Sequence, residues 1–229
     1  MAKTTNFPNG ITNVGPGKDT SLLPFPDPTR YQVYFNDFHE DVVGWTETAT
    51  SAGAGTSAAA IADAAGGILQ ITTAANEDDG LFLESQGESF LLESGKKTWV
   101  KARFSVGDAI QSDLIVGLHS TDTTPLDAAL RFAFISEDGS AALFFNVDDN
   151  TTDADSGTVA TLADDTFVQV AAYYDGGTKI TLYLNDVPVQ TMTSVSLPGA
   201  EMAMGIGYLN GAVDAETSDF DYIMVVKER

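Results

Sequence analysis

The chain has 229 residues, 43% of them hydrophobic, with 13 Phe and 7 Tyr, enough to bury the core of one large domain or two small ones. It has no cysteine, which excludes disulfides, thiolate chemistry and cysteine zinc sites. Acidic residues outnumber basic ones 33 to 11, and the net charge of −22 argues against nucleic-acid binding because phosphate backbones are repelled. No apolar run approaches the roughly 20 residues of a transmembrane helix, and MAKTTNFPNG lacks the apolar region of a secretion signal.

The first 29 residues differ in composition from the rest of the chain. They hold five of the eight prolines, which remove backbone donors and favour extended conformations, so a helix or a central strand is excluded. Six apolar side chains would gain from lying against a surface: Phe7, Ile11, Val14, Leu22, Leu23 and Phe25. We predict that residues 1–29 form an extended arm that docks on a neighbouring subunit or a larger partner. A floppy N-terminus, or a segment that wraps its own domain, is the alternative.

Residues 30–229 are predicted to form one all-β domain. Short apolar or alternating segments, separated by turn sequences such as EDGS, DGGT and LNGA, are typical of strands. The predicted strands cover residues 31–38, 67–72, 80–85, 97–106, 113–119, 130–136, 141–147, 166–174, 179–185, 188–193, 201–208 and 220–226. The stretch 48–67 is rich in Ala, Gly, Ser and Thr and has no apolar stripe, so it predicts a loop with one helical turn.

Alternation within these strands indicates which side chains face the core. In strand 97–106 the inward residues are Val100, Ala102, Phe104 and Val106. Strand 179–185 alternates in the same way and turns Tyr183 outward. Strands at such short spacing, with hardly a helical segment between them, predict a two-sheet antiparallel sandwich.

The sequence FVQVAAYYDGGTKITLYLNDVPVQ (167–190) resembles a hairpin of the concanavalin A-like jelly rolls, which include laminin-G, pentraxin and lectin/glucanase domains. Residues 99–122 resemble the preceding pair of strands, and DFDYIMVVKER (219–229) resembles the closing strand that returns beside the first. The resemblance covers residues 31–229 and implies a jelly-roll sandwich. Asn185-Asp186 replaces the usual Asn-Gly turn, which keeps turn-forming side chains but loses the conformational freedom of glycine.

The whole layout also resembles a group of tailed-phage virion proteins. These begin with MAKTTNFPNGITNV and combine a Pro-rich arm, a single concanavalin-like sandwich, no cysteine and an acidic surface. The resemblance implies a capsid decoration (cement) protein on the outer surface of the virion, with the major capsid protein and copies of itself as partners. The alternative is a lectin-like glycan-binding module on a phage particle, such as a head fibre or appendage, that contacts host surface glycans.

The sequence predicts a protein that is not an enzyme. Glucanases of this fold carry two glutamates in an E-x-D-x-x-E strand, placed across the scissile bond, and this motif is absent. The acidic stretches 75–80 and 147–155 fall in predicted turns. The two histidines, His39 and His119, are expected to be strand-end residues satisfied by neighbours, and no G-x-S-x-G elbow is present. A hydrolase with scattered carboxylates is the least favoured hypothesis.

One loop gathers the hard oxygen ligands that Ca²⁺ prefers. They are Asp148, Asp149, Asn150, Asp153 and Asp155. Their spacing does not match an EF-hand, because the glycine at the sixth place and the closing glutamate are missing. We therefore expect a solvated loop and no cofactor, with a calcium site as the alternative.

Glycan binding would require aromatic faces that point outward beside polar groups. Alternation turns Trp99 and Tyr183 away from the core, which makes them the candidate glycan contacts. Packing beneath a covering loop is the alternative explanation for the same two side chains.

Overall fold

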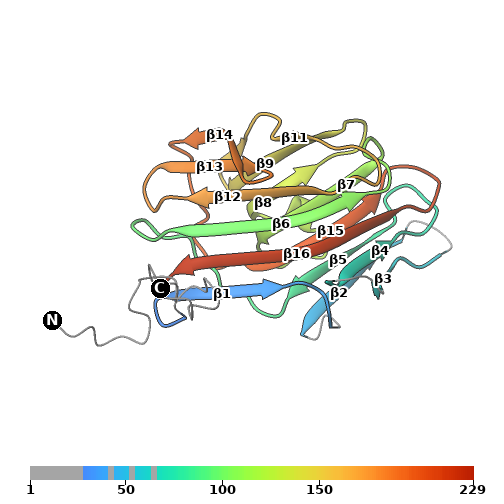
Figure 1. Ribbon diagram of the computed structural model, residues 1–229, viewed down its shortest axis with the longest axis horizontal. Helices are drawn as coiled ribbons and strands as arrows, with labels where there is room; N and C mark the ends of the chain where they lie inside the picture. Colours follow the sequence, from blue (N-terminus) through green and yellow to red (C-terminus); the bar gives the residue numbers. More distant parts are fainter. Residues whose placement is uncertain (1–27, 41–43, 52–54, 63–65) are drawn as a thin grey trace, which may run out of the picture.

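The described structure consists of two antiparallel sheets packed face to face (Figure 1). The computed structural model describes residues 28–40, 44–51, 55–62 and 66–229. We name each sheet after one of its central strands. The β6 sheet has the order β14 (Val187–Thr193), β13 (Lys179–Leu184), β12 (Val168–Tyr174), β6 (Thr98–Val106), β16 (Thr217–Glu228), β4 (Ile68–Thr72), β3 (Ala58–Ala62), with β1 (Tyr31–Asn36) also paired to β16. The β7 sheet has the order β10 (Asp153–Asp155), β9 (Ala142–Asp149), β8 (Leu130–Ser136), β7 (Ser112–His119), β15 (Ala203–Asn210), β5 (Gly80–Ser85), β2 (Trp45–Thr50), with β11 (Ala160–Thr161) also paired to β9.

This architecture confirms the predicted all-β antiparallel sandwich. The one helical element in the described residues is a 3₁₀ turn, η1, at Pro125–Asp127. No described helix has the length and hydrophobicity needed to cross a bilayer. The division into an arm at residues 1–29 and a domain at 30–229 stays a prediction, because residues 1–27 lie outside the described residues.

The hydrophobic core lies between the sheets, where the inward positions of neighbouring strands meet. On β6 the inward residues are fully buried, as the alternation predicts: Val100, Ala102, Phe104 and Val106. The β7 sheet contributes Phe132, Phe134 and Phe145 to the same cluster, and the ring centroid of Phe145 lies 4.8 Å from each of the other two. Each buried aromatic side chain contributes about 1.5–3 kcal/mol, so this layer of side chains holds the sheets together.

Strands β12, β13 and β14 form the continuous meander predicted from residues 167–190. In the first turn, Asp175 Oδ1 accepts the N–H of Gly177 at 2.7 Å. The second turn is the two-residue loop Asn185-Asp186, with φ of 50° and 65°. Asn and Asp tolerate positive φ better than other non-glycine residues, so the turn forms without glycine. The predicted closing strand is β16, which returns beside β1.

Two predictions about loops are wrong. The stretch 48–67 contains the end of β2 and all of β3, which are edge strands of the two sheets. Pairing with β5 and β4 decides their conformation, because tertiary context overrides the weak strand propensity of alanine. The acidic stretch 147–155 contains the end of β9 and all of β10, in which Asp153 pairs with Asp148.

Gly205 on β15 provides a test of how tightly the outer face of the β7 sheet is packed. A Cβ at this position would lie 1.9 Å from Nε2 of His119, which is completely buried. We expect Gly205→Ala to lower the free energy of unfolding by about 1–3 kcal/mol, because the imidazole has no space into which to move. Gly199→Ala is the matched control, since nothing lies within 4 Å of its Cβ position. Urea titrations that give both variants the same stability would contradict this packing.

Candidate functional site

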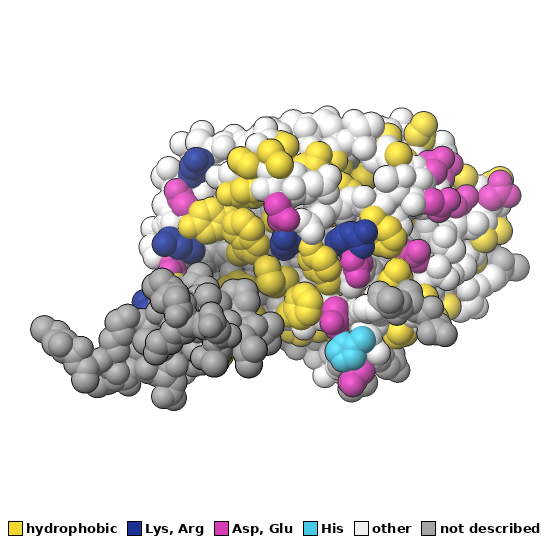
Figure 2. All heavy atoms as spheres, viewed as in Figure 1, with side chains coloured by type: hydrophobic (Ala, Val, Ile, Leu, Met, Phe, Trp, Pro, Cys, Tyr) yellow, Lys and Arg dark blue, Asp and Glu magenta, His cyan; other side chains and the backbone are white. Residues whose placement is uncertain are grey.

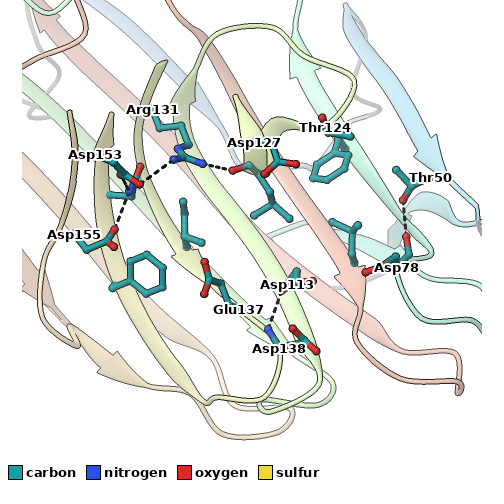
Figure 3. Close-up of a pocket in the computed structure, with 16 residues that line it drawn as sticks. Thr50, Asp78, Asp113, Thr124, Asp127, Arg131, Glu137, Asp138, Asp153 and Asp155 are labelled. Atoms are coloured by element: carbon teal, nitrogen blue, oxygen red, sulfur yellow. Dashed lines mark hydrogen bonds and ion pairs between the residues drawn. The ribbon is translucent and has the colours of Figure 1, made fainter. Parts of the chain in front are cut away.

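The outer face of the β7 sheet carries a groove of about 720 Å³ (Figure 3). Strands β2, β5, β15, β7, β8, β9 and β10 all contribute lining residues, so the groove crosses the whole sheet. In a sandwich only one face of each sheet is needed for the core. The other face of the β7 sheet is therefore free to present a site.

Apolar side chains form the floor of the groove. They are Phe82, Leu126, Ile135, Phe144 and Leu209. These side chains pack together as a hydrophobic cluster that is separate from the core. Gly207 leaves room for the ring of Phe82, since a Cβ at Gly207 would lie 2.1 Å from that ring. Phe82, Ile135 and Leu209 are buried, so the apolar surface that the floor offers to a ligand comes from the half-buried side chains of Leu126 and Phe144.

Carboxylates surround this floor, and a single cation, Arg131, lines the groove with them. The acidic lining residues are Asp78, Asp113, Asp127, Glu137, Asp138, Asp153 and Asp155. Burial raises the pKa of Asp113, and the neighbouring carboxylates of Asp138, Asp78 and Glu137 raise it further. A carboxyl group with a raised pKa in a cleft is a common feature of functional sites. The potential in this groove favours a neutral or cationic ligand.

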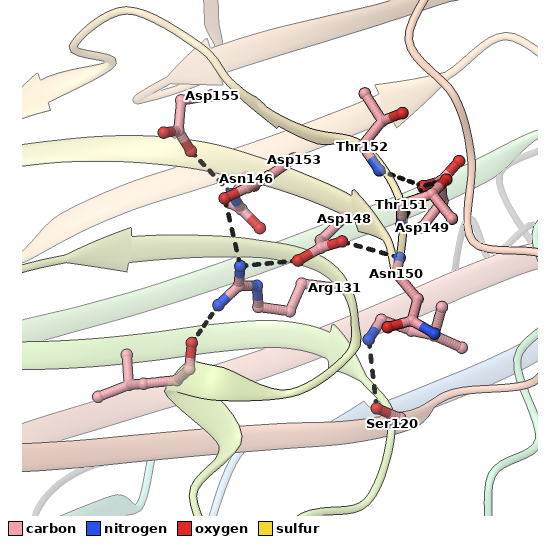
Figure 4. A network of polar contacts seen from close by, with 12 residues as sticks. Ser120, Arg131, Asn146, Asp148, Asp149, Asn150, Thr151, Thr152, Asp153 and Asp155 are labelled. Carbon is pink, nitrogen blue, oxygen red and sulfur yellow. Dashed lines mark hydrogen bonds and ion pairs between the residues drawn. The ribbon is translucent and has the colours of Figure 1, made fainter.

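Protein carboxylates already neutralise the charge of Arg131 (Figure 4). Its Nη2 lies 2.9 Å from Asp148 and 3.5 Å from Asp153. Asn146 Nδ2 donates to Asp153 at 2.5 Å and to Asp155 at 2.8 Å, which fixes the hairpin of β9 and β10. Because Arg131 is engaged in this network, it does not offer a free cation to an anionic ligand.

Two glutamates hold the loop 120–129 over one end of the outer face. Glu84 Oε1 accepts the N–H of Asp122 at 3.0 Å. Glu88 Oε1 accepts the N–H and the hydroxyl of Thr121 at 2.7 Å and 3.0 Å. The loop includes η1, which contributes Leu126 to the groove. The position of this wall therefore depends on two carboxyl groups from elsewhere in the chain.

Beneath this loop lies a buried pair, His119 and Glu84, whose Nδ1 and Oε1 atoms are 3.5 Å apart. Nδ1 is 3.0 Å from the carbonyl oxygen of Ser120, which can only accept, so Nδ1 carries the proton. Burial lowers the pKa of His119 and raises the pKa of Glu84. His119 lies at the end of β7, as predicted, but its Nε2 has no partner in the described structure, so the prediction that neighbours satisfy this side chain is wrong for that atom. His39, by contrast, is exposed and bonds Asp37.

A family model for the concanavalin A-like lectin/glucanase superfamily matches residues 96–225. The chain belongs to this superfamily. The match extends from the start of β6 to the last third of β16 and includes most of the groove. It confirms the concanavalin A-like resemblance of the sequence. No curated protein matches this sequence.

Several solved structures share the fold at low sequence identity. An endo-1,3-β-glucanase from Streptomyces sioyaensis superposes with a TM-score of 0.63 at 12% identity, covering 90% of this chain and 99% of that one. The carbohydrate recognition domain of Emp47p gives 0.59 at 10% identity, with 87% and 97% covered. A carbohydrate esterase from Shiga toxin-encoding bacteriophage phi24B gives 0.51 at 15% identity, with 82% and 92% covered. Likeness at this level establishes the fold alone.

The predicted calcium ligands do not converge in this concanavalin-like domain. Asp148 pairs with Arg131, whereas Asp153 and Asp155 both bind Asn146. Asp149 accepts hydrogen bonds from Thr151, Thr152 and Ser196, which lower its pKa. The described part of the chain contains no group of three or more acidic or histidine side chains arranged to hold a metal ion. A calcium site at this loop stays a prediction.

The predicted glycan contacts, Trp99 and Tyr183, lie together on the outer face of the β6 sheet. The centroid of the Trp99 ring is 5.2 Å from that of Tyr183 and 5.2 Å from that of Tyr173. The three rings are half-buried. This cluster is on the opposite side of the sandwich from the groove, so the two surfaces are separate candidates.

Sequence reasoning missed the groove. Its residues come from strands that are distant in sequence, and only the strand order brings them together. Large apolar residues at outward positions of the predicted strands, such as Phe82, Ile135 and Phe144, were the sequence feature that indicated this surface. The six apolar residues of the predicted arm, from Phe7 to Phe25, lie outside the described residues.

The buried carboxyl group of Glu84 makes stability depend on pH. The pKa of Glu84 in the folded state is raised above the ordinary value of 4.5. The folded state therefore becomes less stable relative to the unfolded state as the pH rises through that folded pKa, because the buried carboxyl group must then ionise. Glu84→Gln keeps a side-chain oxygen that can accept the N–H of Asp122, and it removes the loss of stability at high pH because glutamine does not ionise. We expect the variant to be more stable than the wild type at pH 8 and not at pH 4, in urea titrations.

Glu88→Gln is the matched control, because Glu88 supports the same loop from an exposed position. The variant should show no gain that appears only at high pH. Parallel pH profiles for wild type and Glu84→Gln would contradict a buried ionising carboxyl group at position 84.

Proposed function

We propose that this chain is a non-enzymatic glycan-binding module and that its ligand lies in the groove of the β7 sheet. The observation that carries the proposal is the apolar floor, with the half-buried ring of Phe144, inside a rim of carboxylates. A sugar ring has an apolar face of C–H groups and an edge of hydroxyls. The apolar floor fits the C–H face of the sugar, and the carboxylates accept hydrogen bonds from its hydroxyls.

The charge of the groove supports neutral or amino sugars as ligands. Seven carboxylates line it, and Arg131 is the one cation, already paired with Asp148. An acidic polysaccharide would bring further negative charge into a chain with a net charge of −22. Uronic acid or sulfated glycans are therefore expected to bind poorly.

The fold supports a carbohydrate ligand, because this superfamily includes lectins and glucanases. A non-enzymatic role is supported by the missing E-x-D-x-x-E motif and by the two histidines, neither of which lines the groove. A hydrolase that uses other groove carboxylates is the competing hypothesis. A screen for polysaccharide hydrolysis that detects products would favour it.

We further propose that the module is carried on the outer surface of a phage head as a decoration protein. The resemblance of the sequence to tailed-phage virion proteins supports this location, and an arm at residues 1–29 would provide attachment. The partners would be the major capsid protein and further copies of the chain. The groove would then be available to glycans of the host surface.

The glycan proposal predicts different effects for variants on the two faces. On a glycan array and by titration calorimetry, Phe144→Ala should weaken binding of a neutral or amino-sugar oligosaccharide about tenfold or more, because the apolar floor is lost. Trp99→Ala, on the opposite sheet, should bind like the wild type. Loss of binding in Trp99→Ala with retention in Phe144→Ala would instead place the ligand on the β6 sheet. EDTA should leave binding unchanged; loss of binding in EDTA would support the calcium alternative.

The head-decoration proposal predicts that the arm is required for attachment. A chain that lacks residues 1–29 should no longer sediment with phage heads, and it should keep the glycan affinity of the full chain. The matched control is Phe144→Ala in the full chain, which should still sediment with heads. Equal attachment by the truncated and the full chain would contradict a role for the arm.

A further inference from the structure

The outer face of the β6 sheet is unusually apolar for a surface in contact with solvent. Strand register places Val33, Val226, Trp99 and Tyr173 in one row across β1, β16, β6 and β12. The next row contains Phe35, Met224, Lys101, Ala171 and Tyr183. We call these two rows the apolar face.

Figure 2 shows hydrophobic side chains gathered over these strands. Phe35 is 49% exposed, and Trp99, Tyr173 and Tyr183 are half-buried. A solvent-facing sheet surface normally alternates to polar residues. A contiguous apolar patch of this kind marks a surface that is covered by another chain segment or molecule.

Charge also sets this face apart. Except for Arg131, every described Lys and Arg lies in or beside the strands of the β6 sheet. Acidic partners balance several of them: Lys101 lies 2.6 Å from Asp186, and Arg103 pairs with Asp221. The face is therefore close to neutral in a strongly acidic chain. It suits an apolar occupant with little net charge.

We propose that the apolar face is the docking site of residues 1–27 of this chain. The arm departs beside this face, because β1 pairs with β16 from its first residue onward. Arg229 Nε fixes the point of departure by donating to the carbonyl oxygens of Pro28 and Tyr31 at 3.2 Å and 3.3 Å. Tyr31, the first residue of β1, lies two positions before Val33, so the arm begins on the side of the face where the first apolar row lies.

The length of the arm is sufficient to cover the face. From β1 to β13 there are four strand spacings, or about 19 Å at about 4.8 Å each. An extended chain advances about 3.3 Å per residue, so about six residues cross the five strands. Leu22, Leu23 and Phe25 lie within six residues of Pro28 and can reach Trp99.

The composition of the arm matches the face. Residues 1–27 contain two lysines and two aspartates, so they lack the excess negative charge of the rest of the chain. Their prolines favour an extended conformation that lays alternate side chains on a flat surface at low entropic cost. Docking shelters the apolar side chains of the arm and the apolar face from water before the chain meets any partner. This proposal does not depend on whether the groove binds a glycan.

Hydroxyl-radical footprinting of the full-length chain tests this docking. We compare the wild type with a variant that carries Leu22→Ser, Leu23→Ser and Phe25→Ser. Oxidation of Trp99 and Tyr173 should rise about threefold or more in the variant, because the covering side chains are lost. Trp45, which is 9% exposed, is the internal reference and should not change. A control with Asn6→Ser, Asn9→Ser and Asn13→Ser should behave like the wild type.

Three outcomes would overturn the proposal. One is equal oxidation of Trp99 in the wild type and the apolar arm variant. Another is protection of Trp99 that disappears on about 100-fold dilution and is insensitive to the arm substitutions, which would assign the face to a second copy. Protection that is lost both on dilution and in the arm variant would also contradict docking within one chain, because the arm would then come from a neighbouring copy.

Trypsin cleavage after Lys18 provides the reciprocal test, because docking should protect the arm. A full-length chain with Trp99→Thr and Tyr173→Thr should be cleaved at this site several times faster than the wild type. Thr46→Ser and Thr48→Ser on the outer face of β2 form the matched control and should leave the rate unchanged. Equal rates in all three chains would contradict docking on the apolar face.

Discussion

Packing of the two inward sheet faces against each other is the constraint on which the rest of this structure depends. Side chains alternate along a strand, so the residues that build the core leave every second position for the outside. The phenylalanine cluster of Phe104, Phe132, Phe134 and Phe145 occupies the inward positions. The outward positions of the same strands are therefore available to a ligand or partner, and the loops between the strands add residues such as Leu126 and Asp138.

Those outward positions have different chemistry on the two sheets. The β7 sheet turns outward an apolar floor with a rim of carboxylates, and the β6 sheet turns outward aromatic and aliphatic rows close to most of the cations. A chain with a net charge of −22 is repelled by another acidic surface over most of its area. An apolar partner of this acidic chain therefore meets the least electrostatic repulsion on the outer face of the β6 sheet. The carboxylates of the groove on the β7 sheet disfavour anionic ligands.

Much of the fold could be predicted from the sequence, because alternation and turn chemistry are local. The meander of β12, β13 and β14 and the inward residues of β6 follow from patterns within a few residues. The strands β2 and β3 could not be predicted in this way, because Ala- and Thr-rich segments become strands only through pairing with β5 and β4. The same limit applies to the site. Phe82 and Phe144 lie 62 positions apart in the sequence, and only the strand order brings both into one groove.

The central claim is that the β7 sheet presents the ligand site, and amide chemical-shift mapping tests it most directly. A neutral or amino-sugar oligosaccharide that binds the chain is titrated into ¹⁵N-labelled protein. The account predicts that the largest shifts fall on outward residues of β7, β8, β9 and β15, with β6, β12 and β13 little changed. Shifts concentrated on β6, β12 and β13, with the groove strands unchanged, would contradict it.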